Sequence, residues 1–348
     1  MSVIFKKTRG FSIAFMTDMH IGQSVEDQSG ALLSWITGYS LKPVACIFGG
    51  DMTIGEHNDG NPIPEWLSTY GWDDSIIQLP TIGNHDTRWG ISVTSYAYAD
   101  NDSPHELIKS AYSSLFNGKE WYKWDYQSIR VLVMCNNVDT TGNGYHNCNP
   151  PGYTGSGTPN PDYSGFNTSG SEQWNWVLEN CDSFDGTFLI GVSHRGVYAP
   201  FDRYSLRQSN YLARTGLIRE ATLRGMSVLL QGDQHIGFVG KKYFNHETGT
   251  GPDDIIVVHD VTGVGLWPFE LPGGYVCRQI DLNELPGTGV GTHYLYASGI
   301  GSTDRRAAAM IMTFHGDTAY FEIAQNYTGD PADTYITYSG TIWRNPGQ

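Results

Sequence analysis

Seven side chains with nitrogen or oxygen donors stand out in this chain of 348 residues, because each follows a short apolar run. They are Asp18, His20, Asp51, Asn84, His194, Asp233 and His235. Imidazole and carboxylate donors without a thiolate favour Mn, Fe or Zn over a metal that prefers sulfur. Seven ligands exceed one tetrahedral site, so the pattern favours two ions that share a bridging carboxylate. Two such metals, roughly 3.5–4 Å apart, can hold a hydroxide and offset the charge of a phosphoryl group.

Buried strands are expected to position these donors. The apolar runs that predict strands are residues 11–16, 44–48, 79–82, 188–192 and 226–230. Functional groups in an open α/β sheet gather beyond the carboxyl ends of its strands. Residues two apart in an extended segment point the same way, which predicts that Asp18 and His20 face one point and that Asp233 and His235 do so too. Taken alone, residues 83–86 would favour an ordinary polar turn.

Helical patterns alternate with these strands up to about residue 240. Ser24 precedes an apolar stripe, capping boxes begin at Ser103 and Ser169, and a further helix is expected within residues 208–224. Later residues show only short, strand-like runs. The sequence therefore predicts an α/β fold in a single domain of residues 1–348. Residues 11–240 would form its motif-bearing βα core, and residues 241–348 would complete a second sheet.

Three further side chains are candidates for substrate binding. Residues 136–170 form a long aperiodic insertion rich in Gly, Pro, Asn and Tyr that contains His146; loops of this length are often functional. Arg88 and Arg195 each follow a donor motif closely and could bind a phosphate with two hydrogen bonds. A decorative loop and structural salt bridges are the respective alternatives.

Composition limits the partners. The chain has 21 Lys and Arg against 36 Asp and Glu, a formal charge of −15, which argues against binding to long nucleic acids or anionic membranes. Its five cysteines form no CxxC motif and indicate a reduced protein. We find no signal peptide or transmembrane segment, so a soluble, cytoplasmic protein is the default expectation. Association with a virion and non-classical export stay open, as does the oligomeric state.

Five motifs in order carry a family resemblance. They are Asp18-Met19-His20, Gly50-Asp51, Gly83-Asn84-His85-Asp86, His194 after a strand, and Gly232-Asp233-Gln234-His235. The sequence of about residues 11–240 thereby resembles the calcineurin-like metallophosphoesterases. That resemblance implies a four-layer αββα sandwich of two mixed β-sheets flanked by helices, with two metal ions at the carboxyl edge of the sheets.

The resemblance also implies a role for each matched donor. Asp18, His20 and His235 would bind the first metal, Asp51 would bridge, and Asn84 and His194 would bind the second. The chain departs from the family at Asp233, where the family has histidine. We expect Asp233 to be a ligand, which would favour Mn, Mg or Ca in the second site; the alternative is that it caps a turn and the second site is poorly occupied.

Two neighbouring residues would act on the substrate. By resemblance, His85 would stabilise the transition state or protonate the leaving oxygen, and Asp86 would orient the His85 ring. A metal-bound hydroxide would attack phosphorus in line with the leaving group. His85 and Asp86 are therefore the predicted catalytic pair.

The predicted activity is dinuclear-metal-dependent phosphoester hydrolysis, by a phosphodiesterase or a phosphatase. The acidic chain and its aromatic-rich loops favour a small or nucleotide-like phosphodiester as substrate, because aromatic rings can stack on a base. One alternative is a virion or cell-surface protein that keeps the fold as a scaffold with weak catalysis or none. Another is a nuclease, which a basic groove would support, and for which the pair Lys241 and Lys242 is thin evidence.

Overall fold

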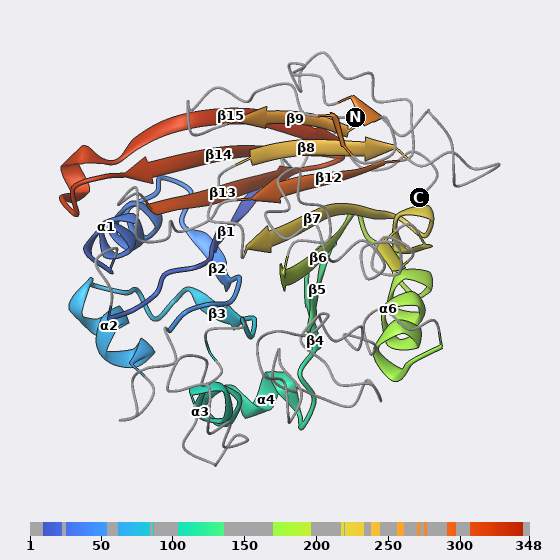
Figure 1. Cartoon of the computed structure of the whole chain (residues 1–348), viewed down its shortest axis with the longest axis horizontal. Coiled ribbons are helices and arrows are strands. Elements are labelled where there is room, and N and C mark those ends of the chain that lie inside the picture. The colour runs from blue at the N-terminus through green and yellow to red at the C-terminus, as the bar shows by residue number, and fades with distance from the viewer. Residues whose placement is uncertain are drawn as a thin grey trace, which may run out of the picture.

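The computed structural model describes residues 10–22, 26–53, 62–83, 86, 104–135, 170–195, 217–218, 220–232, 238–243, 256–260, 270–271, 275–276, 291–296 and 307–343. Two mixed sheets dominate these residues (Figure 1). The six-stranded sheet has the order β15-β14-β13-β1-β2-β3 and the seven-stranded sheet has the order β4-β5-β6-β7-β12-β8-β9. The predicted architecture of two mixed sheets with flanking helices is confirmed.

The six-stranded sheet combines strands from the early and the late parts of the sequence. Its strands are β1 (Phe11–Met16), β2 (Pro43–Phe48), β3 (Ile77–Pro80), β13 (Ala307–His315), β14 (Thr318–Asn326) and β15 (Tyr335–Trp343). Strands β1, β2 and β3 are parallel, whereas β13 lies antiparallel to β1 with Phe11 opposite Phe314. The three parallel strands therefore end at one edge.

The seven-stranded sheet has its own parallel centre. Its strands are β4 (Tyr122–Tyr126), β5 (Ile129–Met134), β6 (Phe188–Arg195), β7 (Met226–Gly232), β8 (Phe238–Tyr243), β9 (Ile256–Asp260) and β12 (Gly291–Tyr296). Strands β5, β6, β7 and β12 run parallel. A separate ribbon pairs β10 (Glu270–Leu271) with β11 (Tyr275–Val276).

The late strands correct one expectation. We expected residues 241–348 to complete the second sheet, but β13, β14 and β15 extend the first sheet beside β1, while β9 and β12 join the other sheet. The correct assignment depends on pairing between residues about 300 positions apart, and no local pattern records that pairing. Whether the whole chain is one domain stays a prediction.

Helices flank the two sheets. They are α1 (Glu26–Thr37), α2 (Ile63–Thr69), α3 (Pro104–Ala111), α4 (Ser113–Phe116), α6 (Glu172–Asp182) and the 3₁₀ turn η3 (Pro331–Asp333). Figure 1 shows α1 and α2 beside the six-stranded sheet and α6 on the opposite side of the molecule, beside the seven-stranded sheet. The Ser171 hydroxyl caps α6 by accepting a hydrogen bond from the Trp174 N–H, at 3.2 Å. None of the helices within these described ranges has the length and apolar character that a bilayer crossing requires.

The described residues also test the remaining helix and strand predictions. Leu217, Ile218 and residues 220–223 are helical, within the predicted range of 208–224. The local pattern did not predict α2, whose Pro62 and Pro64 are typical of a loop, or β8, which contains Gly240 and two lysines. It also did not predict the short elements β10 and η3. Residues 136–169 of the insertion lie outside the described residues.

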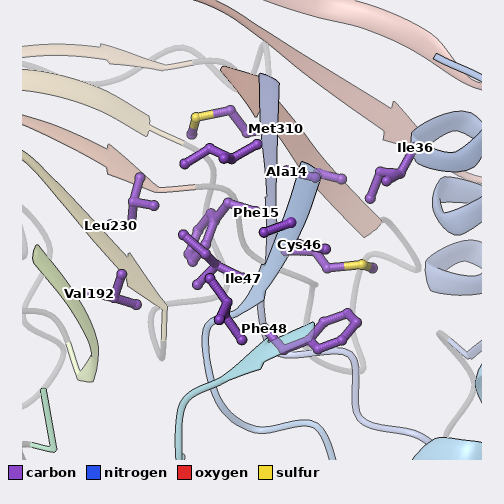
Figure 2. Packing of buried hydrophobic residues seen from close by; sticks show 14 of the residues in the cluster. Ala14, Phe15, Ile36, Cys46, Ile47, Phe48, Val192, Leu230 and Met310 are labelled. Atoms are coloured by element: carbon purple, nitrogen blue, oxygen red, sulfur yellow. The ribbon is translucent and has the colours of Figure 1, made fainter. Parts of the chain in front are cut away.

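Alternation along β5 and β6 of the seven-stranded sheet separates two hydrophobic layers. In β6, Ile190 and Val192 join the cluster between the sheets, whereas Leu189 joins the cluster beneath α6. Figure 2 shows Val192 and Leu230 on one side of Phe15 and Ile47, with Ile36 of α1 on the other side. The core thus packs β1 and β2 between α1 and the second sheet, and it fixes the ends of these strands relative to each other.

Candidate metal centre

Three predicted donors from both sheets meet at one point. Asp18 comes after β1, Asp51 comes after β2 and His194 lies near the end of β6. One ligand atom from each of these side chains lies within 4.8 Å of the other two, and all three side chains are buried. Burying two carboxylates is costly unless a cation or hydrogen bonds compensate their charge. The structure therefore brings these donors together as the sequence predicts, and their binding of metal stays a prediction.

The His194 ring is held in an orientation suited to metal binding. Its Nδ1 lies 2.9 Å from the Gly49 carbonyl oxygen, which can only accept, so Nδ1 carries the proton. Nε2 lies 3.1 Å from Asp51 Oδ1 and is the ring nitrogen that would bind a metal ion. Metal-binding histidines are commonly oriented by such a bond from the other ring nitrogen.

A break in strand register accompanies His194. Ser193 pairs with Gln231 and Arg195 pairs with Gly232, so His194 is an extra residue between two paired positions. Such bulges bend a strand and redirect one side chain, often beside a functional site. Val192 of β6 faces the space between the sheets, and His194 points the same way. Its imidazole therefore reaches Asp51 in the loop after β2 of the other sheet.

The loops that carry Asp18 and Asp51 are bonded to each other through their backbones. The Asp18 N–H donates to the Gly50 carbonyl at 2.9 Å, and the His20 N–H donates to the Asp51 carbonyl at 3.1 Å. The backbone is left-handed at Asp18, His20 and Asp51, with φ of 54°, 46° and 47° respectively. Left-handed backbone is unfavourable for residues other than glycine and persists only where its surroundings impose it.

This geometry corrects the expected backbone path at His20, while its role as a ligand stays a prediction. An extended segment was expected to direct Asp18 and His20 to one point, but β1 ends at Met16 and both residues lie in the left-handed loop. His20 is buried, yet Asp18, Asp51 and His194 form the cluster found among the described residues. The two-residue spacing alone therefore does not establish a shared metal point for Asp18 and His20.

Two glycines bring further strand ends against the cluster. An ideal Cβ on Gly83 would lie 2.0 Å from the Asp51 nitrogen, and one on Gly232 would lie 2.6 Å from Asp18 Oδ2. No side chain fits in either position, because real Cβ contacts are essentially never shorter than 3.0 Å. Gly83, after β3, and Gly232, at the end of β7, therefore lie directly against Asp51 and Asp18.

Asp86 is a fully buried carboxylate beside this cluster. Its Oδ1 accepts a hydrogen bond from the Thr53 N–H at 2.9 Å, and its Oδ2 accepts one from the Gly83 N–H at 2.8 Å. Burial, and after it the neighbouring Asp51 carboxylate, raise the pKa of Asp86 to about 6, although the two backbone bonds and His194 oppose the shift. The described partners of Asp86 are thus backbone groups; its expected role in orienting His85 stays a prediction.

Several predicted site residues lie outside the described residues. They are Asn84, His85, Arg88, His146, Asp233 and His235, together with the side chain of Arg195. Their expected roles as ligands, acid or substrate contacts stay predictions.

Two groups that hydrogen-bond to residues of the cluster were not identified from the sequence. The Thr17 hydroxyl donates to Asp18 Oδ2 at 2.8 Å, and the Gly49 carbonyl orients His194. Thr17 could have been suspected, because a hydroxyl directly precedes a candidate ligand. The Gly49 carbonyl could not, because every residue of the chain offers the same backbone group.

The described donors fit a hard or borderline metal ion. Two carboxylates and an oriented imidazole nitrogen suit Mn, Fe or Zn, and no thiolate is part of the cluster. The close approach of these buried side chains gives a cation several ligands without rearrangement of the loops.

Comparison with known proteins identifies the fold. No protein-family model matches the sequence, and no curated protein is significantly similar to it. Among solved structures, the chain is similar to the purple acid phosphatase PPD1 from yellow lupin (Lupinus luteus) seeds, with a TM-score of 0.57, 12% identity, and coverage of 97% of this chain and 54% of that one. It is also similar to PhoD, with a TM-score of 0.53, 10% identity, and coverage of 96% of this chain and 72% of that one.

These similarities concern the backbone. At 12% and 10% identity they show a common fold, and the chain spans about half the length of the purple acid phosphatase. The fold expected from the five motifs is confirmed.

Proposed function

We propose that this protein is a metal-dependent phosphoester hydrolase with a dinuclear centre. The observation that supports it most is the buried cluster of Asp18, Asp51 and His194, which lies where strand ends of both sheets meet. The fold shared with a purple acid phosphatase adds support. A buried pair of carboxylates with an oriented imidazole is the kind of donor set that such chemistry needs.

Each residue of the cluster would contribute in a distinct way. Asp18 and Asp51 would supply oxygen ligands, and His194 would supply Nε2 because its Nδ1 is engaged by Gly49. When bound, the metal ions would supply Lewis acidity, activating water and offsetting charge on the phosphoryl group. Asn84, His20, His235 and Asp233 would complete the two coordination spheres.

The proton needed by the leaving oxygen would come from His85. A positioned acid typically contributes about 10²–10⁴-fold to the rate. Arg88, Arg195 and His146 would contact the phosphate or the leaving group. The acidic chain and its aromatic-rich insertion support a small or nucleotide-like phosphodiester as substrate over a long nucleic acid.

The deciding experiment combines metal analysis with hydrolysis. The purified chain, reconstituted with Mn²⁺, is expected to hold close to two ions and to hydrolyse a chromogenic phosphodiester faster than its monoester counterpart. Asp51→Asn should lose metal and turnover together. Asp73→Asn is the matched control, because Asp73 pairs with Lys42 on the surface away from the cluster.

Two outcomes would redirect the proposal. Faster cleavage of the monoester would identify a phosphatase and overturn the diester preference. Full metal loading without turnover of either ester would contradict hydrolysis and favour a binding or scaffold protein with this fold.

A further inference from the structure

We infer that Asp86 is a positioning residue that clamps the loop of the proposed metal ligand Asp51 against the loop after β3. The inference rests on the proposed metal site, although not on hydrolysis. Its starting observation is that each oxygen of one buried carboxylate accepts a backbone N–H from a different loop. Thr53 belongs to the loop after β2, and Gly83 belongs to the loop after β3.

The two bonds hold Asp51 from both sides. Thr53 lies two residues after Asp51, and Gly83 is packed so closely that its ideal Cβ would lie 2.2 Å from Asp51 Oδ1. Moving either the Thr53 segment or the Gly83 segment would therefore move the Asp51 carboxylate. Asp86 prevents such movement by connecting the two segments directly.

The restraint extends to the loop after β1. Thr53 forms an isolated parallel bridge with Ile21, and the Ile21 N–H donates to the Met52 carbonyl at 2.9 Å. The Asp18 N–H is bonded to the Gly50 carbonyl in the same ladder. Asp86 therefore acts on both proposed carboxylate ligands, directly beside Asp51 and through the ladder for Asp18.

The left-handed backbone explains why such a restraint is needed. Asp18 and Asp51 both have positive φ, a conformation that local sequence disfavours for these residues. Contacts outside the residue must hold it. A carboxylate bonded to two loops supplies one such contact without occupying a coordination position.

The chemistry requires two acceptors at residue 86. Both backbone partners are donors, and an ionised carboxylate offers only acceptors. An asparagine would keep one acceptor but would turn an NH₂ group towards the second N–H. The substitution Asp86→Asn thus breaks one arm of the clamp while nearly preserving side-chain size.

The test compares Asp86→Asn with Asp330→Asn in the full chain. Asp330 is the matched control, because its Oδ1 also accepts a backbone N–H, that of Ala332 at 2.9 Å, in the turn between β14 and β15. Amide hydrogen exchange is measured at single residues, and Mn²⁺ binding is measured by titration with an electron paramagnetic resonance readout. Asp86→Asn should raise exchange at Thr53 or Gly83 at least about tenfold and weaken Mn²⁺ binding by about 10–100-fold, the usual cost of losing a supporting partner.

The control and a conservative variant separate positioning from general damage. Asp330→Asn should leave Mn²⁺ affinity and the exchange of Thr53 and Gly83 unchanged. Asp86→Glu, which keeps two acceptors, should recover most of the amide protection and part of the Mn²⁺ affinity. This second variant also decides the question if Asp86→Asn fails to fold, since loss of Mn²⁺ binding in Asp86→Glu despite restored protection would overturn the inference.

The outcomes also distinguish this inference from the proposed function. Wild-type chain that binds Mn²⁺ but hydrolyses neither ester, with weakened binding in Asp86→Asn, would support the clamp and overturn the hydrolase. Unchanged exchange and unchanged Mn²⁺ affinity in Asp86→Asn, with turnover lost, would overturn the clamp and assign Asp86 to the orientation of His85. Wild-type chain that binds no Mn²⁺ would overturn both.

Discussion

Replacing Gly83 with alanine tests whether the contact between the loop after β3 and Asp51 sets the metal site. The added Cβ would lie 2.0 Å from the Asp51 nitrogen, whereas ordinary contact begins at 3.4 Å. The two loops would have to separate by about 1.4 Å, and neither can yield by a side-chain rotation because the contact is with backbone. Overpacking of this kind costs about 1–3 kcal/mol or more, so we expect a loss near the upper end of that range in the free energy of unfolding.

Gly83→Ala should affect the site as well as the stability. A displacement of about 1 Å in a catalytic constellation can cost about 10²-fold in rate, so Gly83→Ala should lower turnover at least that much and weaken Mn²⁺ binding. Urea denaturation and Mn²⁺ titration are the assays. Gly118→Ala is the control, because Gly118 also lies in a loop, with φ of +79° and nothing within 4 Å of an added Cβ; it should lose only about 1 kcal/mol from its left-handed backbone. Wild-type Mn²⁺ affinity in Gly83→Ala, with no greater loss of stability than in Gly118→Ala, would refute the reasoning.

Three further changes have distinct expected outcomes. Gln173→Leu removes two hydrogen bonds to the backbone of Cys135, at 2.8 and 2.7 Å, and should lower the free energy of unfolding by about 2–4 kcal/mol because both groups are buried; an unchanged urea midpoint would contradict this. Ile47→Ala opens a cavity between the sheets and should cost about 2–5 kcal/mol, whereas Ile77→Ala, at a side chain 45% exposed, should cost far less; equal losses would count against the assigned core. His85→Ala should keep its metal content while turnover falls by about 10²–10⁴-fold, and full activity in that variant would exclude His85 as the acid.

The meeting of Asp18, Asp51 and His194 could be predicted because it depends on two local properties. Apolar runs predicted the strands, and parallel strands bring the residues after their carboxyl ends to one edge of the sheet. The structure places all three side chains there, although β1 and β2 belong to one sheet and β6 to the other. The order of the strands was not contained in the pattern, since β13 reaches β1 only after about 300 intervening residues.

The backbone of the ligand loops could not be predicted, and the reason is physical. An extended path was the natural expectation after β1, because even Asp and His, which tolerate positive φ better than most residues, adopt it only in a minority of cases. The left-handed path depends on carbonyl groups of Gly50 and Asp51, which come from a different loop. Tertiary hydrogen bonds therefore overrule the local preference at the residues that would bind metal.

The same dependence changes how the motif at residues 83–86 should be interpreted. As a string of donors, its polar residues point to ligands and acid–base groups, and Asp86 was expected to serve His85. The described contacts of Asp86 join the loop that carries Asp51 to the loop after β3, and Gly83 provides the space for that approach. The predicted role of Asp86 towards His85 stays a prediction. By the inference drawn above, the first and last residues of the motif share a structural task, which is to hold the Asp51 carboxylate in place although the Asp51 backbone is left-handed. Substitutions there should alter metal affinity without removing a ligand, and this separates them from substitutions of Asp51 itself.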